Sequence, residues 1–379
     1  PIVYATVGVE GTSIGSITNQ AGEFRLHLAD SLRRKSLVFS HVGYMAQKID
    51  IPLLTAGQHF TLTLEPRIFP LQEVVIRVVH PIRLMREMLE KRMINYSQKP
   101  VYFTTFYREG VQYKQKFRSL TEAVFKIYKS PVQSLYAREQ VKLLKMSRIT
   151  DGLEQDTLIA RMSGGIDACL QLDIINHLPD FLLADAHKDV YAYTSADVTI
   201  VGDHLVNVIS FEQKKEVKEP LYCGELYIDS DNGALLQAQI RIHPRYMKQA
   251  TDMVVQRQAR RMKIVLQELT YTISYKPWNG TYYINHVRGD LHFKVKQKRQ
   301  WLGSSSLHTW FEMVTCKIDT VGVTRFQRNE RIPTRTVFAD THFKYDSDFW
   351  ENFNVIPWEK QLVEVIEQLT SKIEKIEYE

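Results

Sequence analysis

The chain has 379 residues, 44% of them hydrophobic and 24% charged, with a formal net charge of +6. This length favours two or three domains, and the composition is that of a folded protein without low-complexity tracts. Aromatic residues make up 11% of the chain, which favours β structure. No run approaches the roughly eighteen apolar residues of a membrane-spanning helix, so we expect no transmembrane segment in this chain.

The beginning of the chain and its cysteines bear on where the protein is located. The sequence starts at Pro1 inside a strand pattern, without a methionine or a signal peptide. We therefore expect a mature or trimmed chain whose targeting segment is not present. The three cysteines (Cys169, Cys223 and Cys316) are scattered and fit neither a closed disulfide framework nor a zinc site. One disulfide with a free thiol and three buried thiols both remain open.

Residues 1–79 show short alternating strands separated by turns. Strands are predicted at residues 2–9, 15–18, 24–28, 37–41, 48–52 and 60–64. Between the second and third of these, residues 19–23 form a turn in which Gly22 can take a positive φ. Short strands at this spacing predict a β-sandwich.

A series of motifs in this region resembles a known family. Ala5-Thr6-Val7, Gly22-Glu23-Phe24, Val42-Gly43-Tyr44 and Leu71-Gln72-Glu73-Val74-Val75-Ile76 occur in the order found in the carboxypeptidase-like regulatory domain. That family is a transthyretin-like or Ig-like sandwich, common at the front of envelope proteins and outer-membrane receptors of Bacteroidota. The resemblance implies an accessory domain over 1–79, with a truncated first strand and no catalytic groups. It also implies a periplasmic or outer-membrane-associated location.

Later motifs extend the resemblance over most of the chain. Ser163-Gly164-Gly165, Tyr222-Cys223-Gly224-Glu225 and Val287-Arg288 are similar to the second part of a two-domain Bacteroidota family of unknown function that has the same front domain. This similarity implies an envelope protein and brings no assigned activity.

Residues 80–98 predict a connector helix. Pro81 suits a first helical turn, and apolar residues recur at helical spacing with charged residues between them. The apolar stripe consists of Ile82, Met85, Met88, Leu89 and Met93. A methionine-rich stripe suits a partner or ligand, but packing against the next domain is the favoured interpretation.

Residues 99–345 predict a larger antiparallel β-rich domain, a curved sheet or half-barrel with a few helices. A helical insert is expected near 166–186, and strong hairpin turns at Asp229–Gly233 and Asn279-Gly280. By analogy of fold alone, lipoprotein carriers of the envelope have half-barrels that wrap a helix. Residues 346–379 predict a C-terminal amphipathic helix that packs on this domain or binds a partner.

Several patterns that suggest chemistry have simpler explanations. Asp229, Asp231 and Gly233 lack the full ligand series of a calcium loop and suit a hairpin turn. His286 and His292 have no further metal ligands at suitable spacing. Arg288-Gly289-Asp290 lies inside a strand pattern, and Ser163-Gly164-Gly165 lacks a nucleophile elbow. We assign no catalytic, cofactor-binding or metal-binding residue and expect no cofactor.

Two basic stretches form a candidate surface for an anionic ligand, with a solvated strand face as the alternative. The residues are Arg257, Arg260, Arg261, Lys296, Lys298, Arg299 and Trp301. No nucleic-acid recognition module accompanies them, so nucleic acid is not an expected partner.

These observations predict a non-enzymatic cell-envelope protein. Its β-rich domain would bind a lipid, a glycan or an envelope protein. A hydrolase acting on envelope glycan or peptide, and a pure scaffold, are the alternatives.

Overall fold

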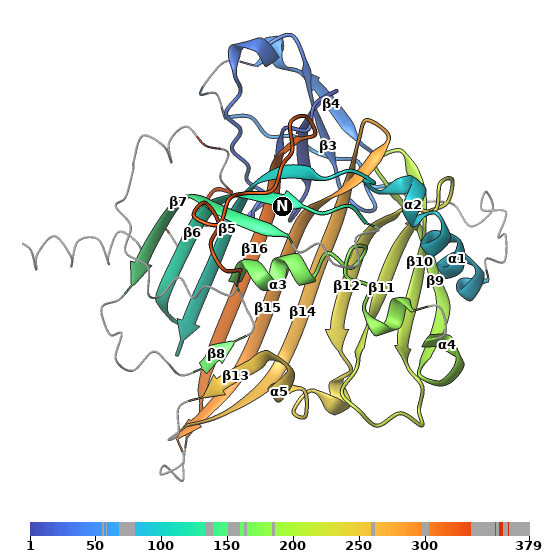
Figure 1. Cartoon of the computed structure of the whole chain (residues 1–379), viewed down its shortest axis with the longest axis vertical. Helices are drawn as coiled ribbons and strands as arrows, with labels where there is room; N and C mark the ends of the chain where they lie inside the picture. The colour runs from blue at the N-terminus through green and yellow to red at the C-terminus, as the bar shows by residue number, and fades with distance from the viewer. Residues whose placement is uncertain are drawn as a thin grey trace, which may run out of the picture.

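The computed structural model describes residues 1–54, 57, 59–67, 80–132, 139–150, 160–162, 165–183, 186–258, 262–297, 303–334, 353, 356–358 and 363. A four-stranded sheet is followed by a ten-stranded antiparallel sheet with a few short helices (Figure 1). The predicted mainly β fold is confirmed. Of the C-terminal helix predicted at 346–379, almost all residues lie outside the described part of the chain.

The N-terminal domain is built on the sheet β2-β1-β3-β4. Its strands are β1 (Thr6–Val9), β2 (Gly15–Ile17), β3 (Ser36–Ser40) and β4 (Gln47–Asp50), with 3-10 turns η1 (Asp30–Leu32) and η2 (Ile51–Leu53). The strands predicted at 24–28 and 60–64 are wrong, because neither segment forms a sheet ladder. Their apolar side chains still pack in the core: Phe24 and Phe60 lie 5.4 and 6.4 Å from Phe39, ring centroid to ring centroid.

The turn after β2 has the predicted chemistry. The Asn19 Oδ1 atom accepts hydrogen bonds from the backbone N–H groups of Ala21 and Glu23, at 2.9 and 2.8 Å. Gly22 has a φ of +78°, a left-handed conformation that favours glycine. The residues that carry the family resemblance here therefore serve turn geometry.

The ten-stranded sheet has the order β7-β6-β5-β16-β15-β14-β12-β11-β10-β9. The strands are β5 (Val101–Tyr113), β6 (Lys116–Lys129), β7 (Gln140–Thr150), β9 (Tyr191–Val201), β10 (His204–Gln213), β11 (Tyr222–Asp229), β12 (Leu235–Ile242), β14 (Met262–Trp278), β15 (Thr281–Gln297) and β16 (Ser305–Asp319). The last strand, β16, pairs with both β15 and β5 and so joins two runs of consecutive hairpins. A separate pair is formed by β8 (Ala160–Met162) and β13 (Val255–Gln258).

Two predicted hairpin turns are present. Asn279 and Gly280 have φ angles of 49° and 74° between β14 and β15, which is the geometry of a two-residue type I′ turn. Asp229 to Gly233 connects β11 to β12. The Asp229 Oδ1 atom there accepts hydrogen bonds from the backbone N–H groups of Asp231 and Asn232.

The helices cover one face of the large sheet, here called the helix face (Figure 1). They are α1 (Pro81–Glu90), α2 (Arg92–Asn95), α3 (Gly165–Gln171), α4 (Ala186–Asp189), α5 (Thr251–Val254) and the 3-10 turns η4 (Asp180–Leu182) and η5 (Pro244–Tyr246). Met88 and Ile166 of the helices belong with Tyr107 and Phe125 of the sheet to one large hydrophobic core. No helix in the described ranges is long and apolar enough to span a membrane.

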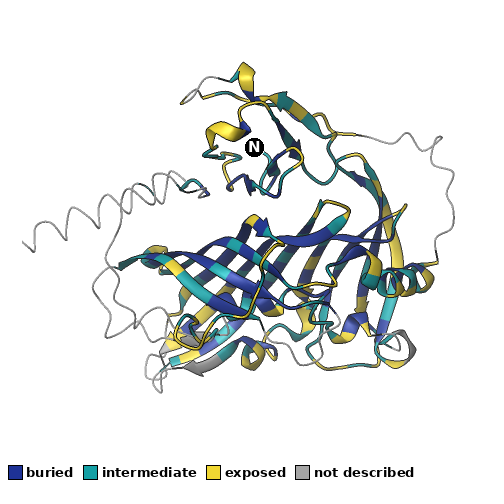
Figure 2. Cartoon of the chain, turned by 45° about the horizontal axis from the view of Figure 1, so that its top comes forward, coloured by how far each residue is buried: buried dark blue, intermediate teal, exposed yellow. Residues whose placement is uncertain are grey.

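The opposite face, here called the sandwich face, carries the N-terminal domain. Ile17 of β2 packs against Phe106, Val124 and Val314, and Figure 2 shows buried residues along the strands beneath this domain. Hydrogen bonds also hold the domain on the sheet. Among them, Ser13 Oγ donates to the Ile318 carbonyl at 3.0 Å, Lys276 Nζ to the Ser13 carbonyl at 3.3 Å, and Asn285 Nδ2 to Thr6 Oγ1 at 3.1 Å. The three cysteines are buried and free, so the alternative of three buried thiols is confirmed.

Candidate functional site

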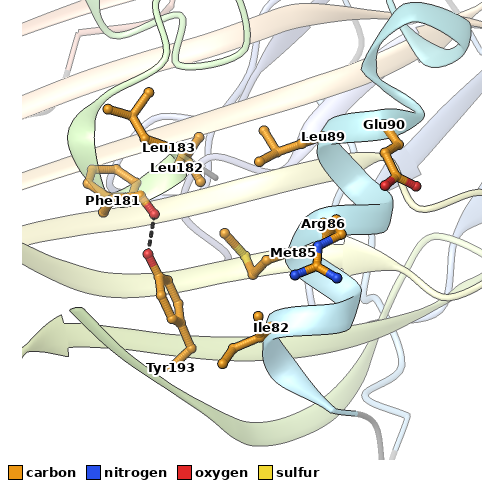
Figure 3. A pocket seen from close by; sticks show the side chains of 9 residues that line it. All are labelled: Ile82, Met85, Arg86, Leu89, Glu90, Phe181, Leu182, Leu183 and Tyr193. Carbon is orange, nitrogen blue, oxygen red and sulfur yellow. Dashed lines mark hydrogen bonds between the residues drawn. The ribbon is translucent and has the colours of Figure 1, made fainter. Parts of the chain in front are cut away.

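An apolar cavity of about 380 Å³ lies on the helix face between α1 and the chain around η4 (Figure 3). Such a volume falls within the range of about 300–1,000 Å³ that is usual for small-molecule sites. The lining residues are Ile82, Met85, Arg86, Leu89, Glu90, Phe181, Leu182, Leu183 and Tyr193. We call this the α1 cavity.

The far wall of the α1 cavity is rigidly held. The Phe181 ring stacks on Phe211 of β10, with ring centroids 4.2 Å apart and planes 18° apart. The Tyr193 hydroxyl donates a hydrogen bond to the Phe181 carbonyl at 2.5 Å. Because both the ring and the backbone of Phe181 are fixed on the sheet, this wall can offer a preformed apolar surface.

The near wall comes from α1. Pro81 occupies the first turn, and the apolar stripe turns Ile82, Met85 and Leu89 toward the cavity. Arg86 and Glu90 lie at its rim, and Leu183 opposite them is 50% exposed. The cavity therefore joins an apolar interior to a charged opening, which suits an amphiphile with one long apolar part.

The sequence suggested only half of this site. The methionine-rich stripe pointed to α1, and Met88 is indeed buried in the core while Leu89 faces the cavity. Phe181 and Tyr193 were not predicted. Pro179 directly precedes η4 and is typical of a helix end, which gives no indication of a cavity.

A row of charged side chains crosses the sandwich face. Strand register places Glu122, Arg108, Glu312 and Arg288 side by side on β6, β5, β16 and β15. All four are at most 6% exposed. We call them the charge row. Along it the charges alternate, with nitrogen–oxygen distances of 2.7, 3.5 and 3.3 Å between neighbours.

Residues from other parts of the chain cover the charge row. Trp358 Nε1 donates to Glu122 at 2.7 Å, and Arg108 donates to the Ile356 carbonyl. Arg288 lies over the rings of Tyr4 and Trp310, 5.4 and 4.9 Å from their centroids. Buried ion pairs are stable only when their remaining hydrogen-bonding groups are satisfied, and these contacts meet that condition. The row is thus a structural junction between the sheet and the N-terminal domain.

The row continues into Asp290 and a histidine pair. Arg288 donates two hydrogen bonds to Asp290, at 2.7 and 2.9 Å. His308 Nε2 lies 3.3 Å from the same carboxylate, and its ring stacks on His292 at 4.0 Å. The predicted strand position of Arg288-Gly289-Asp290 is confirmed, because all three residues lie within β15.

The ionisation of Asp290 follows from these neighbours. Burial alone would raise the pKa of Asp290, but the hydrogen bond from His308 and the charge of Arg288 outweigh burial and lower the pKa to about 2. Burial likewise opposes ionisation of Glu312, yet the interaction with His286 and the charges of Arg288 and Arg108 hold its pKa below the ordinary range. Both carboxylates are therefore ionised at neutral pH.

Replacing Asp290 with asparagine is expected to change how stability depends on acid. The folded-state pKa lies below the ordinary value of 3.8, so ionised Asp290 stabilises the fold above about pH 4, and this contribution is lost as the pH falls through 2. Urea unfolding of wild type and Asp290→Asn should show a free-energy difference that is constant above pH 5 and shrinks toward pH 2. An equal difference at every pH would contradict this assignment.

The predicted anionic-ligand surface is only partly described. Lys296 is exposed on β15 and faces Lys263 of β14 across the register. Arg257 lies on β13. Arg260, Arg261, Lys298, Arg299 and Trp301 lie outside the described residues.

Among the remaining sequence candidates, Asp229 and Asp231 lie with His204 in a group that could hold a metal ion, with ligand atoms all within 4.8 Å of one another. Asp229 is fully buried and lies 2.7 Å from His204 Nδ1, while Asp231 belongs to the turn. His286 is buried beneath the N-terminal domain, with its ring 4.9 Å from Tyr4, and His292 lies further along the same strand. Ser163 and Gly164 lie outside the described residues.

Comparison with known proteins classifies the N-terminal domain. Residues 1–76 match the CarboxypepD_reg-like domain family, which confirms the predicted resemblance for this part of the chain. The chain thus has an N-terminal part, residues 1–76, that matches this family, followed by a ten-stranded antiparallel sheet. No curated protein matches the sequence.

The solved structures that are similar to this chain are distant from it. A domain from Vibrio parahaemolyticus, described as an outer membrane lipoprotein-sorting protein domain, is 10% identical, covers 64% of this chain and 94% of its own, and has a TM-score of 0.27. A DUF1329 family protein from Desulfovibrio piger is 10% identical, with 65% and 96% covered and a TM-score of 0.28. A LolA superfamily protein from Nitrosomonas europaea is 9% identical, with 65% and 96% covered and a TM-score of 0.23. Likenesses at this level do not bear on the function of this chain.

Proposed function

We propose that this is a non-enzymatic binding protein of the cell envelope that holds the apolar part of a lipid in the α1 cavity. The observation that carries the proposal is the cavity itself, which has about 380 Å³ and a lining dominated by Ile82, Met85, Leu89 and Phe181. Each methylene group moved from water into such a lining contributes about 0.8 kcal/mol. An acyl chain is the ligand class that gains most from it.

The rim of the cavity supports an amphiphilic ligand rather than a purely apolar one. Arg86 and Glu90 lie at the opening, where a polar headgroup would meet charged side chains and water. A glycan has little apolar surface to bury and is a weaker candidate for this site. A partner protein could use the same cavity by inserting apolar side chains.

The hydrolase alternative finds less support in the described residues. A polar cluster joins Lys129 to Glu139 and Asp173 at 2.7 and 2.8 Å, with His177 3.1 Å from Glu139. The cavity beside it measures only about 20 Å³, room for about one water molecule. A pure scaffold, the other alternative, would have no sizeable pocket. The α1 cavity therefore argues against a pure scaffold.

The proposal also covers the role of the N-terminal domain and the cellular location of the protein. We infer an accessory role for the domain, because its described residues serve turns, core and contacts with the sheet. The family resemblance supports a periplasmic or outer-membrane-associated protein.

Filling the cavity should weaken lipid binding. In Leu89→Trp the indole would occupy the space between α1 and Phe181, and we expect at least tenfold weaker binding of a fluorescent fatty-acid analogue, a change of about 1.4 kcal/mol. Fluorescence titration of the purified protein measures this effect.

The matched control is Ile94→Trp, which adds the same ring on α2, where Ile94 is 77% exposed. It should bind like wild type. Failure of wild type to bind the analogue, or equal binding by both variants, would contradict a lipid site in the α1 cavity.

A further inference from the structure

One end of the large sheet exposes a group of lysines on adjacent strands. Lys263 and Lys296 lie directly opposite each other on β14 and β15, and Lys294 faces Val265 two positions along. Lys114 follows in the β5–β6 turn, where its backbone N–H donates to the Ser306 carbonyl at 2.9 Å. Together with Lys116 of β6, these residues form what we call the lysine end; all five are exposed.

Among the described residues, the lysine end carries positive charge that its neighbours do not balance. Like charges directly opposite each other on neighbouring strands destabilise a sheet, yet Lys263 and Lys296 occupy such a pair. Within the described part of the chain, none of the five lysines makes an ion pair with a carboxylate. Glu268, opposite His292, is the acidic residue on the neighbouring stretch of these strands.

The position of the lysine end separates it from the other charged groups. It lies on the outer part of β14 and β15, beyond the histidine pair, whereas the N-terminal domain sits over the other end of the same strands (Figure 1). The basic residues of the charge row are neutralised by Glu122 and Glu312. The lysine end is therefore open to an external anionic partner.

We propose that the lysine end docks the protein on an anionic lipid bilayer. Lysines are compact, strongly hydrated point charges that respond to the field of a charged surface, whereas bidentate recognition of single phosphates is the property of arginine. Five lysines spread over neighbouring strands suit a broad surface better than a small ligand. This proposal does not depend on a ligand in the α1 cavity.

The test is flotation of the whole purified protein with vesicles. The probes are phosphatidylcholine vesicles with and without phosphatidylglycerol. Wild type should float only with the anionic vesicles, and less as salt is raised, because added salt screens exposed charges. The triple variant Lys263→Gln, Lys294→Gln, Lys296→Gln should lose roughly a hundredfold in affinity.

A charge-matched control removes three exposed lysines elsewhere: Lys99→Gln, Lys215→Gln, Lys218→Gln. Lys215 and Lys218 adjoin Glu216 and Glu219, so their charge is balanced locally, and this variant should float like wild type. If both triple variants lost vesicle binding equally, binding would depend on net charge and not on the lysine end, and the proposal would be overturned. Wild type that ignores anionic vesicles, or that binds an acidic polysaccharide instead, would overturn it as well.

Discussion

Replacing Arg288 with methionine is expected to lower the free energy of unfolding by about 3–5 kcal/mol. The change would leave the buried carboxylate of Glu312, which is 2% exposed, with Arg108 at 3.5 Å and His286 at 3.9 Å. Asp290 would lose two hydrogen bonds at the same time. The cost arises because a buried charge without its partner cannot recover its hydration. Urea denaturation followed by tryptophan fluorescence measures the effect.

Arg83→Met is the matched control for this experiment. Arg83 lies 3.5 Å from Glu87 in an i,i+4 pair on α1, and its side chain is 72% exposed. Exposed pairs of this kind contribute about 0.3–0.5 kcal/mol, so the control should unfold almost like wild type. Similar losses in both variants would show that the charge row does not stabilise the junction of sheet and N-terminal domain.

Truncating Phe181 to alanine is expected to cost about 3–5 kcal/mol of unfolding free energy. Its side chain is 1% exposed and stacks on Phe211, so the substitution removes a ring from a closed core and leaves a void beside it. The void also enlarges the α1 cavity. Thermal and urea unfolding would report the loss, and titration with a fatty-acid analogue would report the change in the cavity.

Leu183→Ala tests the same wall without breaking the core. Leu183 lines the cavity but is 50% exposed, so we expect a loss of about 1 kcal/mol or less. If Phe181→Ala were as mild as Leu183→Ala, the far wall of the cavity would not be anchored by the stack on Phe211.

Much of the fold could be predicted because its signals are local. Alternating residues indicated most strands, and Asn279-Gly280 indicated a hairpin whose two positive φ angles the structure shows. The strands predicted at 24–28 and 60–64 failed because alternation reports which side chains are buried. Phe24 and Phe60 are packed in the core, but their backbones pair with no strand.

The arrangement of strands could not be predicted in the same way. Alternation within a strand does not reveal which strand lies beside it, and β16 pairs with β5, about 200 residues earlier in the chain. This pairing places Glu312 between Arg108 and Arg288. The sequence therefore showed the charged residues of the row but not their relation to one another.

Only one wall of the candidate site could be predicted from the sequence. The apolar stripe on α1 was visible from helical spacing, whereas its opposite wall comes from Phe181 and Tyr193, roughly a hundred residues away. Those residues have no motif, because a cavity wall requires only apolar side chains held at a distance from another apolar surface. Of the predicted basic surface, Lys296 belongs to the lysine end, which register extends to Lys263 and Lys294.

The proposal that the α1 cavity holds an acyl chain can be tested most directly by photolabelling. A fatty acid with a photoreactive diazirine near the end of its chain would be bound to the purified protein, irradiated, and its attachment sites mapped by peptide mass spectrometry. We expect labels on α1 and on residues 181–193, reduced by excess unlabelled fatty acid and absent in Leu89→Trp. Labels confined to other parts of the chain, or labels in this region that excess fatty acid does not reduce, would contradict it.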